Sequence, residues 1–162
     1  MNLEETLRVL YDASVEFVLI GGAAMGLQGS AHLTKDMDFC YERSRLNQER
    51  LAKALKPYHP TLRGAPADLP FRFDAETIER GLNFTLRTDL GDIDFLSEVS
   101  GLGTFESVKA ASDLKNVGGI ECRVLSLAGL IKSKSAAGRA RDLYVLPELK
   151  ALEELKRKTQ SE

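Results

Sequence analysis

The stretch from Phe17 to Phe39 limits most strongly what this chain can fold into. It begins with four consecutive apolar residues, FVLI, and such a run is typical of a strand that is buried on both faces. Gly21 and Gly22 end the run, and the small residues at 23–28 then favour a short helix. The stretch therefore predicts a strand, a glycine turn and a helix, followed by a second strand.

The second strand is predicted at 36–41, where polar and apolar residues alternate. Alternation places Asp36 and Asp38 on the same face of the strand, roughly 7 Å apart along the chain. Two ionised carboxylates that lie side by side repel each other unless a cation binds between them. Oxygen ligands of this kind suit Mg²⁺, which takes its remaining ligands from water and phosphate groups. The alternative interpretation is an ordinary strand with one solvated face.

A third carboxylate comes from a predicted hairpin, whose strands lie at 82–88 and 92–96 on either side of a glycine turn. Asp94 has an apolar residue on each side, so it is expected to project from a strand whose other face is core. Asp92 lies on the same face, but its position next to the turn also fits a turn residue. We therefore prefer Asp94 as the third carboxylate, which would complete a two-metal arrangement.

The remaining pattern alternates between helices and strands. Helices are predicted at 2–13, 46–55, 105–111, 127–137, 139–145 and 147–158, with Pro147 separating the last two. A small hairpin is predicted at 115–117 and 120–125, and the proline-rich segment 59–74 is predicted to be a loop. Together these elements predict an α/β (α+β) fold, with a mixed sheet flanked by helices. We expect a single domain, with a core at 1–125 and a C-terminal helical extension at 126–162 packed on that core.

Composition excludes several classes of protein. With 22 Lys and Arg against 24 Asp and Glu in 162 residues, the chain carries no overall basic field for nucleic acid. No apolar run is long enough to span a membrane, and the acidic start MNLEETLRVL does not fit a secretory signal. Cys40 and Cys122 lie far apart, which favours two buried thiols in a reducing compartment. The sequence therefore predicts a cytoplasmic protein.

Two further features are compatible with phosphate binding. The amides at Gly21 and Gly22 would approach a phosphate closely at a helix start, although a tight turn explains the same residues. A basic group near the C-terminus would form charge-assisted hydrogen bonds to a triphosphate or to RNA. A solvated helix face is the alternative for this group, which comprises Lys132, Lys134, Arg139 and Arg141.

These motifs, taken together, resemble one superfamily. Gly21-Gly22, the DMDF run that starts at Asp36, and the IDF run around Asp94 resemble the pattern of the nucleotidyltransferases that include DNA polymerase beta. Within that superfamily the chain looks most like small bacterial enzymes related to the AbiEii-type abortive-infection toxins. The run LAGLIKSKSAAGRARDLYVLPEL is similar to the helical signature of that group, and the resemblance extends over residues 5–152.

The resemblance implies a role for each matched residue. Gly21 and Gly22 would contact a nucleoside triphosphate, Asp36 and Asp38 would bind Mg²⁺, and Asp94 would be the third ligand and a general base. From the C-terminal helices, the residues that would approach the phosphates or form the R.rD element are Lys132, Lys134, Arg139 and Asp142. Two positions depart from the family: Ala23 stands where many members have serine, and Val145 stands where they have a second aspartate.

The implied activity is transfer of a nucleoside monophosphate to an acceptor hydroxyl with release of pyrophosphate. The acceptor stays open between tRNA, a protein and a small molecule, and the resemblance also admits a partner antitoxin. Two alternatives remain. One is a non-catalytic nucleotide-binding or toxin–antitoxin module that keeps the fold, and the other is a purely structural domain.

Overall fold

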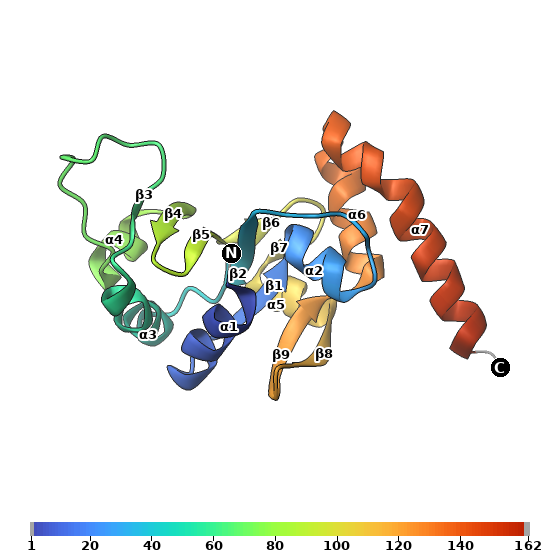
Figure 1. Ribbon diagram of the computed structural model, residues 1–162, viewed down its shortest axis with the longest axis horizontal. Helices are drawn as coiled ribbons and strands as arrows, with labels where there is room; N and C mark the ends of the chain where they lie inside the picture. The colour runs from blue at the N-terminus through green and yellow to red at the C-terminus, as the bar shows by residue number, and fades with distance from the viewer. Residues whose placement is uncertain (1, 161–162) are drawn as a thin grey trace.

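The computed structural model describes residues 2–160. Residue 1 of the predicted core and residues 161–162 of the predicted helical extension therefore lie outside the described residues. A seven-stranded mixed sheet forms the centre, with helices around it (Figure 1). The strands of this sheet, in spatial order, are β3 (Thr61–Leu62), β4 (Phe84–Thr88), β5 (Gly91–Leu96), β2 (Asp36–Tyr41), β1 (Phe17–Ile20), β9 (Ile120–Leu125) and β8 (Ser112–Val117). The predicted mixed α/β sheet is therefore confirmed.

Helices surround this sheet and the α6–α7 pair extends to one side (Figure 1). Their bounds are α1 (Leu3–Asp12), α2 (Gly21–Leu27), α3 (Arg45–Leu55), α4 (Ala75–Arg80), α5 (Phe105–Ala110), α6 (Leu127–Ala137) and α7 (Ala140–Gln160). A 3-10 turn at Lys56–Tyr58 follows α3, and a two-stranded ribbon, β6 (Glu98–Val99) with β7 (Gly103–Thr104), precedes α5. No helix within residues 2–160 has the length and apolar content needed to cross a membrane.

Strand β2 is the middle strand of the seven-stranded sheet. It runs antiparallel to β1 and parallel to β5. The residues of β2 that point to the core have no exposed surface, and the ring of Phe39 stacks on that of Phe95 in β5 at 5.6 Å between centroids. The opposite face of β2 carries Asp36 and Asp38, which keep partial exposure. The alternation in the sequence thus becomes one apolar face and one acidic face.

Local signals account for most helix ends. Asn2 accepts a hydrogen bond from the Glu5 amide at 3.3 Å, and Ser126 accepts one from the Gly129 amide at 3.0 Å. Gly138 ends α6 in the left-handed conformation, at φ +64°. These side chains satisfy amides that have no partner inside the helix, so the predicted starts of α1 and α6 are confirmed.

Two predictions differ from the structure, and one helix was not predicted. Helix α7 continues through Pro147, although two helices were predicted, because Leu146 and Leu149 on either side are buried and hold the helix against the core. The two glycines form the first residues of α2 and not a turn before it. Helix α4 was not predicted, because a helix of six residues is too short to show a recognisable hydrophobic periodicity.

Candidate functional site

Four carboxylates lie on the acidic face of β2 and β5 in two lateral rows. The parallel pairing sets Asp38 opposite Asp94, and Asp36 opposite Asp92. Neighbouring strands are about 4.8 Å apart, so paired residues on one face bring their side chains together. The structure thus brings the three predicted carboxylates together. It also places Asp92 in the strand itself, beside them, where the sequence left a turn position as an alternative.

Gly21 brings the start of α2 against Asp38. Ile20 pairs with Asp38 across β1 and β2, and the chain then turns into the helix at Gly21 with φ +64°. A Cβ atom at Gly21 would overlap Asp38 Oδ2 and lie 3.0 Å from Asp38 Cγ. Gly22 lies against Thr34, since a Cβ atom at position 22 would lie 2.6 Å from Thr34 Cβ. Both positions therefore require a residue without a side chain, and Gly21 leaves backbone next to the carboxylate.

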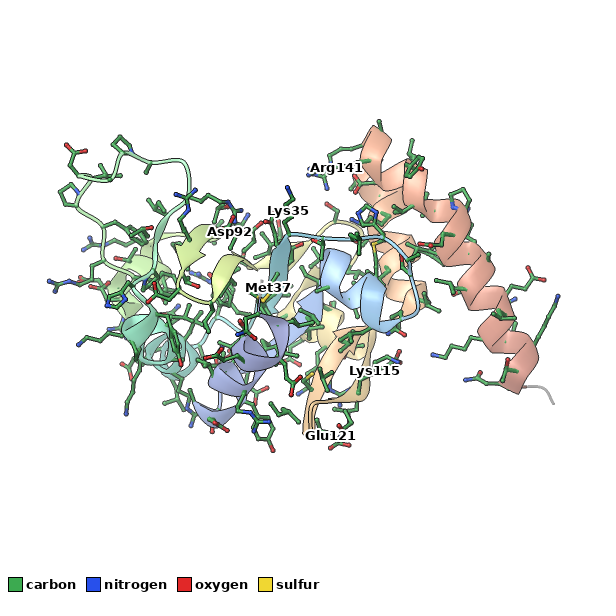
Figure 2. All side chains as sticks on the ribbon, in the orientation of Figure 1. Lys35, Met37, Asp92, Lys115, Glu121 and Arg141 are labelled. Atoms are coloured by element: carbon green, nitrogen blue, oxygen red, sulfur yellow. The ribbon has the colours of Figure 1, made fainter. Side chains whose placement is uncertain are left out.

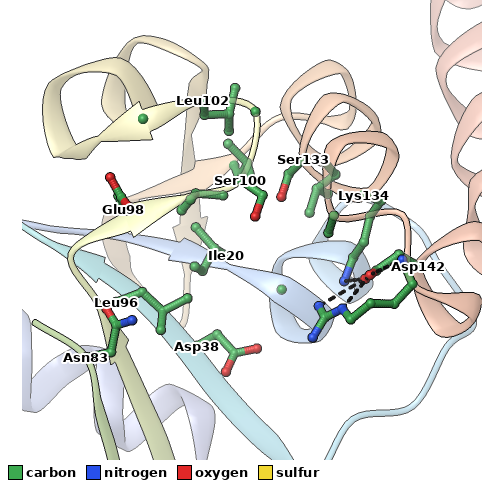
Figure 3. A pocket seen from close by; sticks show the side chains of 18 residues that line it. Ile20, Asp38, Asn83, Leu96, Glu98, Ser100, Leu102, Ser133, Lys134 and Asp142 are labelled. Atoms are coloured by element: carbon green, nitrogen blue, oxygen red, sulfur yellow. Dashed lines mark hydrogen bonds and ion pairs between the residues drawn. The ribbon is translucent and has the colours of Figure 1, made fainter.

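A pocket of about 760 Å³ opens beside Asp38 (Figure 3). Asp38 and Gly21 line one side of it, and Lys134 of α6 and Arg139, in the connection between α6 and α7, line another. Figure 3 shows the Asp38 carboxylate directed into this pocket, with Lys134 across from it. Other polar lining residues, which the sequence motifs did not single out, are Asn83, Glu98, Ser100 and Ser133. The pocket thus lies between a basic wall and Asp38. We call Asp38 and the neighbouring strand carboxylates Asp36, Asp92 and Asp94, which are not among the lining residues, the acidic wall.

Asp142 positions the basic wall. Its side chain has no exposed surface and accepts a hydrogen bond from Arg139 Nε at 2.6 Å. Lys134 Nζ lies 3.3 Å from Asp142 Oδ1, and the Arg139 backbone amide also donates to this carboxylate (Figure 3). Burial alone would raise the pKa of Asp142, but the hydrogen bond from Arg139 and the charge of Lys134 hold that pKa below its ordinary value.

The surroundings of Asp38 disfavour the negative charge of its carboxylate. Burial raises the pKa of Asp38 to about 7, and the charge of Asp94, a hydrogen bond with Asp94 and the charge of Asp36 act in the same direction. The charge of Lys134 opposes this shift. Burial and neighbouring negative charge both disfavour an ionised carboxylate, whereas a bound cation would favour it. The electrostatics of the acidic wall therefore favour a positive ligand.

Arg63 contacts the acidic wall from the edge of the sheet, and no sequence motif pointed to it. Its Nη2 lies 2.5 Å from Asp94 Oδ1, while its Nη1 lies 3.6 Å from Asp92 Oδ2 and 4.0 Å from Asp36 Oδ1. Burial acts to lower the pKa of Arg63, but the hydrogen bond to Asp94 and the three carboxylate charges raise it. Arg63 follows a two-residue strand in the segment predicted as a loop, where hydrophobic periodicity carries no signal.

Two of the predicted basic residues do not line the pocket. Lys132 is exposed and lines a separate hollow beside Ser112, because residues two apart on a helix point in nearly opposite directions. Arg141 is exposed on α7 and does not line the pocket with Lys134 (Figure 2). The proposed phosphate-binding residues of the helices therefore reduce to Lys134 and Arg139.

The acidic wall has the donor chemistry that Mg²⁺ requires. Mg²⁺ is commonly bound by one or two carboxylates together with phosphate oxygens, and Asp36, Asp38 and Asp94 offer only oxygen donors. Within residues 2–160, no three His, Cys, Asp or Glu side chains already surround one point as metal ligands. The guanidinium of Arg63 lies among these carboxylates as a positive group. The oxygen donors thus fit the ion by their chemistry, although the three carboxylates do not surround one point and Arg63 already contacts Asp94.

The sequence matches no protein-family model and no curated protein. Among solved structures, the chain is similar to the lincosamide antibiotic adenylyltransferase LnuA with lincomycin bound, at a TM-score of 0.60 and 14% identity. This match covers 93% of the present chain and 96% of the other. A proposed nucleotidyltransferase from Thermotoga maritima also aligns, at a TM-score of 0.47 and 14% identity over 100% of this chain and 97% of that one. The likeness to LnuA establishes that the chain has a nucleotidyltransferase fold.

Proposed function

We propose that this protein is a Mg²⁺-dependent nucleotidyltransferase, which transfers a nucleoside monophosphate from a nucleoside triphosphate to an acceptor hydroxyl. One observation carries the proposal: the β2–β5 register sets Asp38 beside Asp94, and Asp38 faces Lys134 across a pocket of about 760 Å³. Carboxylates on one wall and a lysine on the other suit a metal-bound triphosphate. The fold shared with LnuA agrees with this assignment.

Each part of the pocket has a role in this reaction. Lys134 and Arg139 would bind phosphate oxygens, and Asp142 would hold both side chains in place. The backbone at Gly21 and Gly22 would approach the triphosphate, and Asp36, Asp38 and Asp94 would hold Mg²⁺. When bound, Mg²⁺ would neutralise charge on the phosphates and polarise the reacting groups.

The reaction itself is an in-line displacement. The acceptor oxygen forms a bond to the α-phosphorus while the bond to pyrophosphate breaks, and Asp94 accepts the proton of the hydroxyl. Most of the rate increase would come from positioning and electrostatics, because the side chains form no covalent bond to the substrate. Nucleoside triphosphates and the two buried free cysteines, Cys40 and Cys122, fit a reducing, cytoplasmic compartment.

The acceptor is the open part of the proposal. LnuA is an antibiotic adenylyltransferase, so hydroxyl-bearing small molecules are the first acceptors to test, before tRNA and protein. The finer resemblance to AbiEii-type toxins, and with it a partner antitoxin, stays a prediction from the sequence. The same holds for the division into a core at 1–125 and a helical extension at 126–162.

A labelled-nucleotide assay tests the function. The purified protein is incubated with Mg²⁺, each of the four labelled nucleoside triphosphates and panels of small molecules, tRNA and protein. We expect label to enter one acceptor class, with pyrophosphate released in equal amount, and Asp38→Asn to abolish transfer. Asp12→Asn, an exposed residue at the end of α1, is the matched control and should keep full activity.

Two results would lead to other conclusions. Full activity of Asp38→Asn would exclude the proposed site. Metal-dependent triphosphate binding without transfer to any acceptor would instead favour the alternative, a non-catalytic nucleotide-binding or toxin–antitoxin module. A melting temperature that does not rise with Mg²⁺ and nucleotide together would favour a structural domain, because a ligand that binds the folded state stabilises it.

A further inference from the structure

Arg63 reaches the carboxylates because the sheet places it in their row. Thr85 of β4 pairs with Asp94 of β5, and the Arg63 amide donates to the Thr85 carbonyl at 3.0 Å. Arg63, Thr85 and Asp94 therefore follow one another across the same face of three adjacent chain segments. Threonine is short, so the long arginine side chain can cross over it to Asp94.

The contact is a close and partly buried ion pair. The side chains of Arg63 and Asp94 are 21% and 22% exposed, and their charged atoms are 2.5 Å apart. The same guanidinium lies within 4.0 Å of Asp92 and Asp36. A buried pair of this kind is stronger than an exposed one, since water and salt screen it less. The positive charge of Arg63 thus lies where three carboxylates converge.

We propose that Arg63 is a built-in counter-ion of this acidic face, which competes with a divalent metal ion for Asp94 and must move away before the ion binds there. The inference rests on the proposed function, because that function supplies the metal. It assigns a regulatory role to β3 and to the segment that follows it. This segment then sets how tightly the empty enzyme holds metal, apart from any contact with nucleotide.

The local structure allows such a movement. Strand β3 has two residues and lies at the edge of the sheet, where it pairs with β4 alone. Arg63 is followed by Gly64 at φ +84° and then by a segment with two prolines and without a helix or strand. Moving this edge breaks few backbone hydrogen bonds, whereas β5 and β2 lie inside the sheet and stay in place. Asp94 can therefore be freed without disturbing its own strand.

Metal binding to the nucleotide-free protein provides the test. Mn²⁺ is used as a paramagnetic probe, and free Mn²⁺ is measured by electron paramagnetic resonance during titration of the wild type and Arg63→Met. We expect Arg63→Met to bind Mn²⁺ about tenfold more tightly, because a hydrogen bond to a charged group no longer has to be broken. Arg63→Lys keeps the charge without the planar fork, and its affinity should lie between the two.

Arg87→Met is the matched control. Arg87 lies on the same face and its loss changes the net charge equally, but its side chain is 69% exposed and its Nε is 4.0 Å from Asp92. Its affinity should stay within about threefold of the wild type, since an exposed charge is screened. Thermal unfolding of each variant without metal verifies that it is folded.

The outcomes separate the two proposals. Equal Mn²⁺ affinity of the wild type and Arg63→Met, or an equal gain in Arg63→Met and Arg87→Met, would overturn the competition while leaving nucleotidyl transfer intact. Absence of Mn²⁺ binding by every variant, with and without a nucleoside triphosphate, would overturn the competition and the metal-dependent function together. Tighter binding by Arg63→Met alone supports both.

Discussion

Replacement of Gly21 by alanine should disturb the fold and the site at the same time. Gly21 has φ +64°, and a Cβ atom at this position would overlap the carboxylate of Asp38. An alanine must therefore adopt a left-handed conformation and also displace Asp38 from the pocket wall. Both effects follow from the first residue of α2, where β1 passes directly into the helix.

The magnitude has two parts. The left-handed conformation costs a non-glycine residue about 1–2 kcal/mol. Forcing the Asp38 side chain away from its rotamer costs about 0.5–1.5 kcal/mol. Gly21→Ala should thus lower the free energy of unfolding by about 1.5–3.5 kcal/mol, and it should weaken nucleotide binding because Asp38 has moved.

Gly26 in the same helix provides the control. It is exposed, its φ is not positive, and a Cβ atom there would have no neighbour within 4 Å. Gly26→Ala should therefore raise the free energy of unfolding by about 0.4–1 kcal/mol, because alanine restricts the unfolded chain more than glycine does. The two substitutions are chemically identical and five residues apart, yet opposite signs are expected.

Urea unfolding, followed by circular dichroism, measures both variants. Binding of a nucleoside triphosphate with Mg²⁺, measured by calorimetry, then separates the two effects of Gly21→Ala. If Gly21→Ala is as stable as the wild type, the close approach of Gly21 to Asp38 is refuted. If it is destabilised but binds nucleotide normally, the close approach of Gly21 to Asp38 is supported and Asp38 does not take part in binding.

Three further predictions concern other parts of the chain. Asp142→Asn should lower the free energy of unfolding by about 1.5–3 kcal/mol, because charged hydrogen bonds to a buried carboxylate are lost. Since the folded-state pKa of Asp142 is depressed, its stabilisation is complete above about pH 4, the ordinary pKa of an aspartate, and is lost as the pH falls through the folded pKa. Urea unfolding at pH 7 and pH 3 should therefore show a smaller difference between the wild type and Asp142→Asn at pH 3. An equal difference would refute the stabilisation of the ionised Asp142 by Arg139 and Lys134. Ser126→Ala removes the cap of α6 and should cost about 1 kcal/mol in thermal or urea unfolding, and a variant as stable as the wild type would show that this cap contributes nothing. Burial raises the pKa of Cys40 to about 12, so a disulfide reagent at pH 8 should not modify Cys40 or the buried Cys122 until the protein is unfolded, and rapid labelling of the folded protein would contradict their burial.

Local patterns in the sequence determined most of the elements. The apolar run at 17–20, the alternation at 36–41 and the glycine turn before β5 each depend on neighbouring residues, and each element forms where it was predicted. The same holds for the capped starts of α1 and α6. These signals are local because strand alternation, turn conformation and helix capping involve residues only a few positions apart.

Tertiary structure decided which of these elements meet. The parallel register of β2 and β5 sets Asp38 beside Asp94, and a parallel pairing depends on a crossover whose geometry no local pattern records. Packing also overrode a local rule at Pro147, where buried leucines carry α7 past the proline.

The stretch from Phe17 to Phe39 contained half of the candidate site, and the sequence alone determined that half. The sequence also indicated Lys134 and Asp142 as candidate residues, but it did not predict the ion pair between them. No pattern in the sequence indicated Arg63, because its contact with Asp94 depends on the order of β3, β4 and β5 across the sheet. Contacts between residues distant in the chain are created by the packing of the sheet as a whole, so only the tertiary structure could place a cation among these carboxylates.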